Sequence, residues 1–515
     1  MCKEKTTLRG SITVFASLSL LLVASFLLVL LEAARVKGLD AYSLMQRVNA
    51  MESVFSEYDR QLFEQYGVFL LDAGYGEQTL QFSQINGCLQ SVSQKNLRPV
   101  VPKTLWKNIQ NFYQMDVTDA TVTGYLLATD YDGAPFRRMA VESMKAGYPA
   151  ELAQKLYDGL QSSDYAMAQA KQSRSAMNQA QENIEIAKEE QARTAAEKNS
   201  QETQETQETK EEPTVDASVE NPMDVVKAVQ ETDILTLVMP SGSHISTKSI
   251  QGKQMLEHRS LLQGNEPWQA SGSWYEKVLY HRFLQTHFSC YGTNEFSGGA
   301  LDYELEYIQA GKHTDRENLK YVVQQLLLLR EGANFMYLQT DAAKRQEAYA
   351  MATALASAFG IAPAAGLIAQ GILAAWAYTE SILDVRTLLA GGKIAWLKTA
   401  ESWSSSLSGL GGLLAGSAQA KEQASGEDYQ GYLQKLLYLK AERALNYRAM
   451  DLMELRAGIN RGDELRMDTM ILALRADFCY VSDPLFSEMV TTQRLPEGQW
   501  EFSETAYYSY FSECE

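Results

Sequence analysis

Residues 10–31 read GSITVFASLSLLLVASFLLVLL, and no charged side chain occurs from Ser11 to Leu31. Fourteen of these twenty-one residues are Leu, Ile, Val or Phe. As a helix, the segment would be about 30 Å long, which matches the hydrocarbon core of a bilayer. Its large apolar side chains favour the bilayer by roughly 4–8 kcal/mol on the membrane-insertion scale. The segment therefore predicts a membrane-spanning helix.

A removable secretory signal is the main alternative, because Lys3, Lys5 and Arg9 precede the apolar run. Such a signal has an apolar region of about 7–15 residues that ends in small side chains. This run is longer and ends in Leu-Leu-Glu at residue 32. We therefore expect an uncleaved, single-pass anchor in the cell membrane. Basic residues also follow the run, but the cluster before it is tighter, which favours a cytoplasmic N-terminus and an extracellular bulk.

Charge and cysteine content describe an acidic globular protein. The net charge of −18 argues against nucleic acid or an anionic membrane surface as a partner. Four cysteines follow the apolar run, namely Cys88, Cys290, Cys479 and Cys514. An even number in an exported protein permits disulfides, with three connectivities, and free thiols are the alternative.

Beyond the span, apolar residues recur every three or four positions from Val36 to Leu62, as on one face of a helix. A helix continuous from Ser11 to Phe63 would be about 80 Å long, half in lipid and half a stalk. The simpler interpretation is that this apolar stripe packs on its own domain. The functional interpretation is that the stripe also contacts neighbouring subunits.

Strand patterns occur on both sides of a long helical region. Residues 67–72 and 120–128 have the pattern of buried strands, and residues 136–165 that of a helix. Near the C-terminus, Met470–Tyr480 and Trp500–Phe511 predict two more strands. We expect antiparallel pairing between the early and the late strands to close one domain.

Composition changes sharply at residues 166–220, which are rich in Ala, Gln, Glu and Lys and contain the repeat QETQETQET. Such a stretch predicts a low-complexity acidic linker, with a first half that favours helix. Residues 221–462 then show mainly helical periodicity. Within them Ala348–Thr379 carries no charge, but it consists largely of small residues. We predict a buried helical hairpin there and not a second membrane span.

No catalytic constellation is apparent in the sequence, which contains no GxSxG, GxxxxGK[ST] or HExxH motif. His281, His287 and Cys290 lie close together, but their spacing matches no common zinc signature. We therefore expect no catalytic residue, no cofactor and no metal. A hydrolase is the alternative.

Several segments resemble known families. The segment Gly10–Phe15 and the Leu-rich helix after it resemble the N-termini of TadE/TadG-type pilus proteins, which are prepilin-like. More closely, the chain resembles an uncharacterised family of membrane-anchored proteins of Gram-positive anaerobes, found with tight-adherence pilus or type II secretion-like machinery. The segments that carry this second resemblance are Gly10–Phe15, Leu31–Val36, Glu64–Asp72, Asn221–Val226, Leu329–Phe335, and Ala374–Tyr378 through Asp384–Gly392.

The prepilin resemblance implies a candidate processing site at Gly10 and Ser11. Prepilins usually carry Glu at the fifth position after the cleaved glycine, where it pairs with a neighbouring N-terminus during assembly. That position is Phe15 in this chain, and the nearest acid that follows is Glu32. We therefore expect the leader to be retained.

The sequence thus predicts an α+β fold, in which an N-terminal transmembrane helix extends into a stalk and an antiparallel-sheet ectodomain is interrupted by a large helical region. The expected function is a non-enzymatic envelope component of a Tad-like pilus or secretion apparatus, either an assembly scaffold or a minor pilin-like subunit. Its expected partners are the bilayer and other proteins of the machinery, contacted through residues 36–63. The alternative is an extracellular ligand- or protein-binding module that uses residues 320–460.

The expected domain organisation has five parts. They are a leader and transmembrane helix (1–35), a stalk with the first part of the α+β domain (36–165), the acidic linker (166–220), the helical region (221–462) and a C-terminal β segment (463–515).

Overall fold

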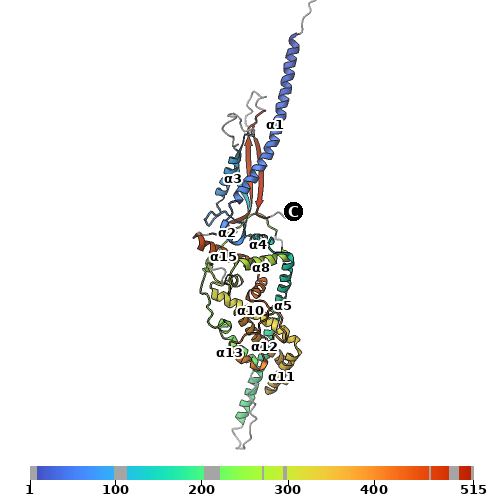
Figure 1. Cartoon of the computed structure of the whole chain (residues 1–515), viewed down its shortest axis with the longest axis vertical. Coiled ribbons are helices and arrows are strands. Elements are labelled where there is room, and N and C mark those ends of the chain that lie inside the picture. The colour runs from blue at the N-terminus through green and yellow to red at the C-terminus, as the bar shows by residue number, and fades with distance from the viewer. Residues whose placement is uncertain are drawn as a thin grey trace, which may run out of the picture. The chain divides into compact units, whose positions relative to one another are not determined.

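The computed structural model describes residues 9–97, 113–201, 221–269, 272–293, 298–462, 465–486 and 498–511. The chain forms two compact units, whose helices and strands are labelled in Figure 1. The sheet unit comprises Met1–Ser143, Leu261–Ala270 and Gly462–Glu515, and the helical unit comprises Met144–Ser260 and Ser271–Arg461.

The sheet unit begins with α1 (Arg9–Phe55), a single helix of 47 residues. In the part of the chain that the structure describes, α1 is the one helix long and apolar enough to cross a membrane, and its most apolar window is not buried. The helix ends before the expected Phe63. The reason is that Asp59 caps a new helix, α2 (Arg60–Tyr66), by accepting a hydrogen bond from the backbone N–H of Leu62 at 2.9 Å.

The sheet has four strands, and β3 (Met470–Ser482) is their common partner. It pairs antiparallel with β1 (Leu71–Asp72), β2 (Met115–Leu127) and β4 (Trp500–Ser509). Strands from the two ends of the chain therefore close one sheet, which confirms the predicted pairing. The expected strand at residues 67–72 is reduced to Leu71–Asp72, because Gly67 caps the end of α2 and the Leu70 carbonyl accepts a hydrogen bond from the Asp59 N–H at 2.8 Å.

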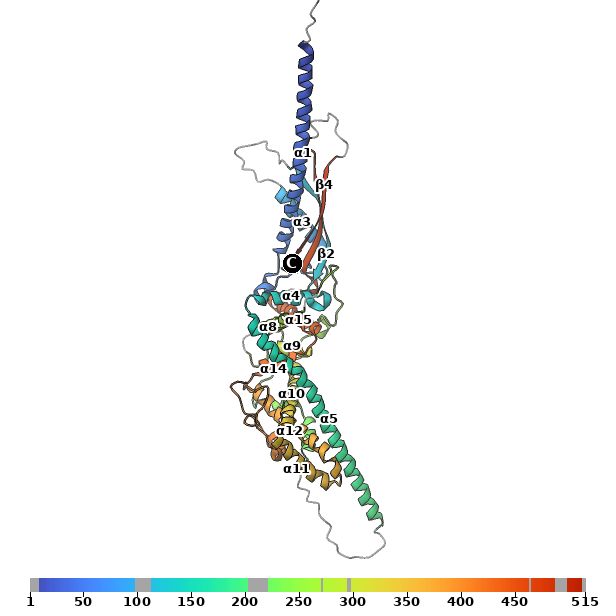
Figure 2. The ribbon, with the colours of Figure 1, turned by 90° about the vertical axis from the view of Figure 1, so that its right-hand side faces the viewer.

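Two helices cover one face of this sheet, namely α1 and α3 (Phe82–Leu97). Figure 2 shows α1 lying alongside β4. From the apolar stripe of α1, the side chains of Leu39, Met51 and Phe55 are buried in the core between helices and sheet. The interpretation that the stripe packs on its own domain is thus confirmed for these residues. The predicted stalk half of the helix is therefore packed along a sheet.

The predicted helix at residues 136–165 is two helices. The first, α4 (Asp130–Lys145), belongs to the sheet unit, and the second, α5 (Ala150–Gln201), belongs to the helical unit. Pro149 precedes the second helix. The α conformation is disfavoured for a residue that precedes proline, so helices commonly end at or before that residue.

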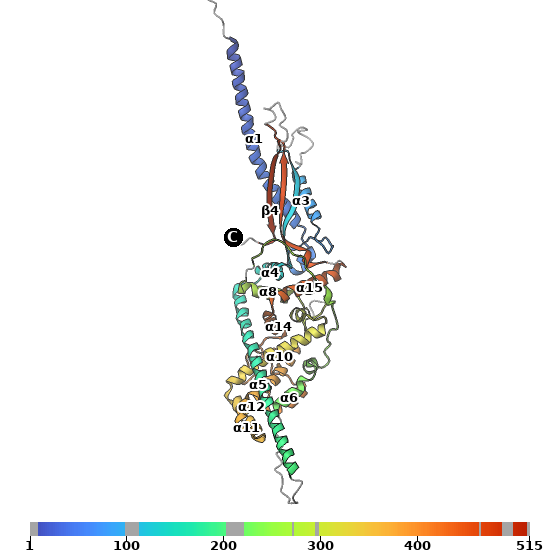
Figure 3. The same ribbon diagram turned by 180° about the vertical axis from the view of Figure 1, so that it is seen from behind.

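The helical unit is built around α5, α10 (Asp315–Thr340) and α12 (Ala365–Leu389), which pack against one another (Figure 3). The helices that surround them are α6 (Pro222–Gln230), α7 (Ile234–Val238), α8 (Trp274–His287), α9 (Glu304–Ala310), α11 (Ala342–Ala358), α13 (Leu410–Ala415), α14 (Tyr429–Tyr438) and α15 (Glu442–Arg461).

The first half of the predicted acidic linker, whose composition favours helix, is part of α5, which continues to Gln201. Its buried face consists largely of small residues, such as Ala166, Ala170 and Ala180, so the partner helices can approach closely. A Cβ on Gly332 of α10 would clash with the backbone of Ala166. Large apolar side chains are therefore not needed for packing here. The rest of the predicted linker, residues 202–220, lies outside the described residues.

The uncharged stretch Ala348–Thr379 spans most of α11 and the first half of α12, which pack against each other as a hairpin. Within α12, every residue from Gly371 to Leu389 is buried. The predicted helical hairpin is confirmed.

Candidate functional site

The first candidate is the exposed apolar half of α1. Gly10 and Ser11, the candidate processing site, lie in its first turn. Phe15 is 72 % exposed, and Leu21 and Leu28 belong to the same uncharged run. This half of the helix is not covered by the described part of its own chain, so it is available to a bilayer or to other apolar helices.

A buried ion pair lies directly after this apolar run. Glu32 and Arg35 are one turn apart on α1, and Arg35 Nη1 lies 3.0 Å from Glu32 Oε1. Both side chains are buried. Arg35 also donates to Ser482 Oγ at 2.6 Å, to the Asp483 carbonyl at 2.9 Å and to the Tyr113 carbonyl at 2.5 Å. The arginine thereby ties α1 to the ends of β2 and β3.

Glu32 binds the segment that follows β3 and the first residue of β4. Its carboxylate accepts hydrogen bonds from the backbone N–H groups of Leu485 and Phe486, at 3.2 and 2.7 Å, and from Trp500 Nε1 at 3.1 Å. Burial alone would raise the pKa of Glu32. The Phe486 N–H, Arg35 and Trp500 outweigh burial and hold the pKa below its usual range. We name Glu32, Arg35 and these partners the strand-end clamp.

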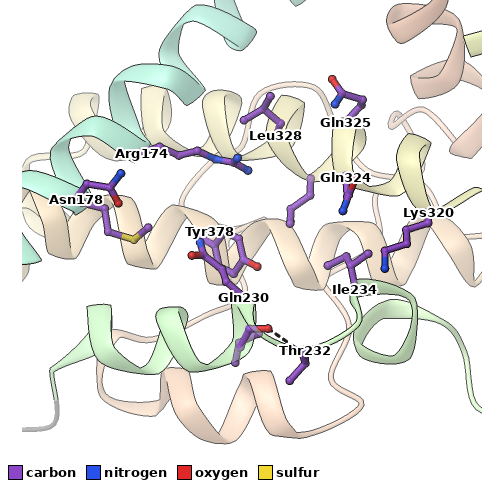
Figure 4. Close-up of a pocket in the computed structure, with 13 residues that line it drawn as sticks. Arg174, Asn178, Gln230, Thr232, Ile234, Lys320, Gln324, Gln325, Leu328 and Tyr378 are labelled. Atoms are coloured by element: carbon purple, nitrogen blue, oxygen red, sulfur yellow. Dashed lines mark hydrogen bonds between the residues drawn. The ribbon is translucent and has the colours of Figure 1, made fainter. Parts of the chain in front are cut away.

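The second candidate is a cavity of about 670 Å³ in the helical unit (Figure 4). It is lined from four sides, by α5, by α10, by α12, and by α6 with the segment after it. Most of its lining side chains are polar. These are Arg174, Asn178, Gln230, Thr232, Lys320, Gln324, Gln325 and Tyr378.

The charged groups of this cavity are two cations, and none of the thirteen lining residues that the structure describes is acidic. Arg174 Nε lies 3.1 Å from the buried Glu331 carboxylate, and Lys320 Nζ lies 3.0 Å from Asp233. Both cations keep more than two fifths of their side-chain surface exposed. Each is thus held by a carboxylate and still reachable by a solute, which suits a polar ligand that carries negative charge.

A buried ionic network forms the centre of the helical unit. Asp384 of α12 lies 3.0 Å from Arg330 of α10 and 2.7 Å from Lys398, and Lys398 lies 2.8 Å from Glu380. All four side chains are at most 1 % exposed. Asn334 donates to Asp384 at 2.9 Å. With two charges of each sign and this degree of burial, the network holds helices together and does not offer a site for a solute.

Two other buried carboxylates lack a close cation. Burial raises the pKa of Glu306 to about 7, although hydrogen bonds from the Tyr291 N–H and the Tyr429 hydroxyl act in the opposite direction. Burial likewise raises the pKa of Asp451 to about 7, against a hydrogen bond from the Leu256 N–H. Such values occur in catalytic acids, but neither residue lines the cavity of Figure 4.

Of the four possible disulfide cysteines, the three that the structure describes are not paired with one another. Cys88, Cys290 and Cys479 are free thiols, and Cys514 lies outside the described residues. Cys88 packs against the core of the sheet unit, whereas Cys479 alternates along β3 with the core residues Phe478 and Tyr480 and so faces away from that core. Burial raises the pKa of both the Cys88 and the Cys290 thiol. A raised pKa lowers thiol reactivity.

Sequence reasoning missed the strand-end clamp and the cavity. The partners of Glu32 are more than 450 positions away in the sequence. The cavity combines four elements with no shared motif. The sequence did contain a signal for the ionic network, since its residues lie in segments that carry the family resemblance. Arg330 and Asn334 lie in Leu329–Phe335, and Asp384 begins the segment Asp384–Gly392.

Together the fold and these sites define a class: an α+β protein with one N-terminal helix long and apolar enough to span a membrane and with a large helical unit. A family model described as a family of unknown function, DUF5702, matches residues 212–482, just over half of the chain. The chain belongs to this family. The match includes the ionic network and β3, and it ends before β4. No curated protein and no solved structure matches the chain.

Proposed function

We propose that the chain is a non-enzymatic, membrane-anchored component of the cell envelope that serves a Tad-like pilus or secretion apparatus, as an assembly scaffold or a minor pilin-like subunit. The observation that carries this proposal is the form of α1. Its first half is bare and apolar, and its second half continues without a break along a sheet. The resemblance of Gly10–Phe15 to TadE/TadG-type proteins supports the pilus or secretion context.

In this proposal the N-terminus is cytoplasmic and the two units are extracellular, because the basic leader is the tighter cationic cluster. Contacts with other proteins of the machinery use the exposed side of α1 beyond the span. There Leu44, Met45 and Val48 are 50, 49 and 41 % exposed. An apolar patch of this kind next to a membrane suits another helix.

Fractionation of native cells tests the anchor. The chain should sediment with membranes, resist a high-salt wash and be released by detergent. Replacing both Leu21 and Leu28 by Arg should release it, since each charge near the centre of a span costs roughly 2.5–3.5 kcal/mol. Leu397→Arg is the control, because Leu397 is a 59 % exposed leucine outside both the span and the proposed contact on α1. Release of the native chain by salt alone would contradict the anchor.

The contact with the machinery is tested by a photo-crosslinking residue at Met45, with one at the exposed Thr505 of β4 as control. Adducts with pilus or secretion components should form from position 45 and not from position 505. Adducts that are equal at both positions would contradict a specific contact through α1.

The cavity of the helical unit favours a second candidate, a binding module for a small polar solute with negative charge. Residues 320–328 supply one wall, and α5, α6 and α12 supply the others. Calorimetric titration with glucose 6-phosphate and with glucose shows whether binding requires the negative charge of the solute. Lys320→Gln should weaken binding of the phosphate, whereas Lys227→Gln, an exposed lysine that does not line the cavity, should not. No heat from either sugar, or equal heats, would contradict this candidate.

A further inference from the structure

The strand-end clamp sets the distance of the sheet from the apolar run of α1. Glu32 directly follows Leu31, the last residue of that run, and α1 is helical on both sides of this point. An α-helix rises about 1.5 Å per residue. The depth of every residue near position 32 is therefore fixed by where the span ends.

The polar layer on each side of a bilayer is about 5–7 Å thick, from a hydrocarbon core of about 30 Å and a total thickness of about 40–45 Å. If residues 11–31 cross the core, residues 32–36 lie within this headgroup layer. This step rests on the membrane span of the proposed function. Glu32 and Arg35 then lie at headgroup depth.

The hydrogen bonds of the clamp place the end of the sheet at the same depth. Trp500 Nε1 lies 3.1 Å from Glu32, and the Phe486 N–H lies 2.7 Å from it. Arg35 reaches the Asp483 carbonyl at 2.9 Å. Because these hydrogen bonds are direct, no layer of water separates the end of the sheet from the headgroup layer in which Glu32 lies.

The opposite end of β4 shows in which direction the sheet extends from the bilayer. β4 runs from Trp500, at Glu32, to the region of Phe55 at the other end of α1, where the rings of Phe55 and Tyr508 are 4.7 Å apart (Figure 2). The sheet therefore extends away from the bilayer, and only the end with Trp500 approaches it.

We propose that this end of the sheet is a second membrane contact, in which Trp500, Leu485 and Phe486 enter the lipid headgroup layer beside α1. The chemistry fits, because tryptophan is enriched at membrane–water interfaces, where its ring is apolar and its N–H is polar. Trp500 is 40 % exposed, and Leu485 and Phe486 are partly exposed. The buried charges of the clamp contribute no net charge at this depth, since Glu32 and Arg35 neutralise each other.

Depth-dependent fluorescence quenching tests the contact. The full chain is reconstituted in phosphatidylcholine vesicles that contain lipid brominated either near the headgroup or near the end of the acyl chain. The contribution of Trp500 is the difference between the native chain and Trp500→Phe. We expect bromine near the headgroup to quench this contribution at least two-fold more than bromine at the chain end.

A second variant serves as the control for depth in the bilayer. Tyr507→Trp in the Trp500→Phe background puts an exposed tryptophan seven residues further along β4, about 23 Å away, and its emission should be quenched by neither lipid. Equal quenching of positions 500 and 507, or none at position 500 while the chain still resists a high-salt wash, would overturn the second contact and leave the anchor intact. Loss of the chain from the vesicles in high salt would overturn the span and this inference with it.

Discussion

Glu32 and Arg35 form a buried ion pair, with 3.0 Å between Oε1 and Nη1, in the first turn after the uncharged run of α1. A charge pair at this position ends the apolar run and at the same time binds the strand ends through hydrogen bonds to six further described residues. Directly after its apolar run, α1 is thereby joined to its own folded domain. After the apolar run, α1 is therefore not a free stalk. One side of the helix packs on the sheet unit, and the other side is exposed.

Removal of Arg35 should destabilise the sheet unit. Arg35→Met leaves the Glu32 carboxylate buried without its cation, and breaking a buried pair costs about 3–5 kcal/mol. Chemical denaturation of the full chain in detergent, followed by circular dichroism, measures the loss. Lys37→Met changes an exposed lysine two residues away and should cost less than about 0.5 kcal/mol. Similar losses for both variants would mean that the clamp contributes nothing.

Local patterns in the sequence predicted the membrane helix, β3 and β4, because a long uncharged run and a strict alternation each depend on neighbouring residues alone. The end of α1 was not predicted. It depends on Asp59 accepting from Leu62, and the apolar stripe continues past that cap. The helical first half of the predicted linker is confirmed by α5, but the packing of this helix was not predicted. α5 packs through alanines against Gly332 and Gly371, and small residues are a weak hydrophobic signal.

The ionic network of the helical unit should be as sensitive as the clamp. Asp384→Asn leaves Arg330 and Lys398 buried with Glu380 as their one remaining carboxylate in the network. We expect a loss of about 3–5 kcal/mol in the free energy of unfolding. Lys227→Gln breaks an exposed pair with Glu185 and should leave the free energy of unfolding nearly unchanged. Denaturation curves that coincide for these two variants would contradict the structural role of the network.

The buried Glu306 should make stability depend on pH. Its pKa is about 7 in the folded chain against an ordinary 4.5, so folding takes up a proton between these values. The stabilising contribution of the protonated acid is complete below pH 4.5 and is lost as the pH rises through about 7. Glu306→Gln cannot ionise, so relative to the native chain it should gain roughly 3 kcal/mol between pH 4 and pH 9.

The exposed Glu347 provides the control for this pH dependence. Glu347→Gln should follow the native curve of unfolding free energy at every pH. A constant difference between Glu306→Gln and the native chain across the range would show that Glu306 has the same pKa in the folded and the unfolded chain, contrary to the raised pKa.

Limited proteolysis tests the joining of distant segments. The composition of residues 201–212 predicts the first cut there at a low dose of protease. The two pieces should remain together on a sizing column, because β2 pairs with β3 and α5 packs on α10 and α12. Pieces that separate without denaturant would contradict both contacts.

The candidate sites were harder to predict than the fold, and the reason is sequence distance. Arg330 and Asp384 belong to segments that already stood out as family patterns, but their contact spans 54 positions. The cavity depends on Arg174 and Lys320, which lie in different helices and in no common motif. Neither local periodicity nor residue spacing encodes such a contact.

The intact mass of the chain extracted from native membranes tests the central claim, a retained α1 that anchors the protein beside the machinery. Cleavage after Gly10 would create an ammonium group with Phe15, and not an acid, at the fifth position. Burying that unpaired charge in an apolar filament core would cost several kcal/mol. We predict a mass that includes Lys3, Lys5 and Arg9. A mature chain that begins at Ser11 would keep the apolar run but contradict the retained leader, and it would favour a processed, pilin-like subunit over a scaffold.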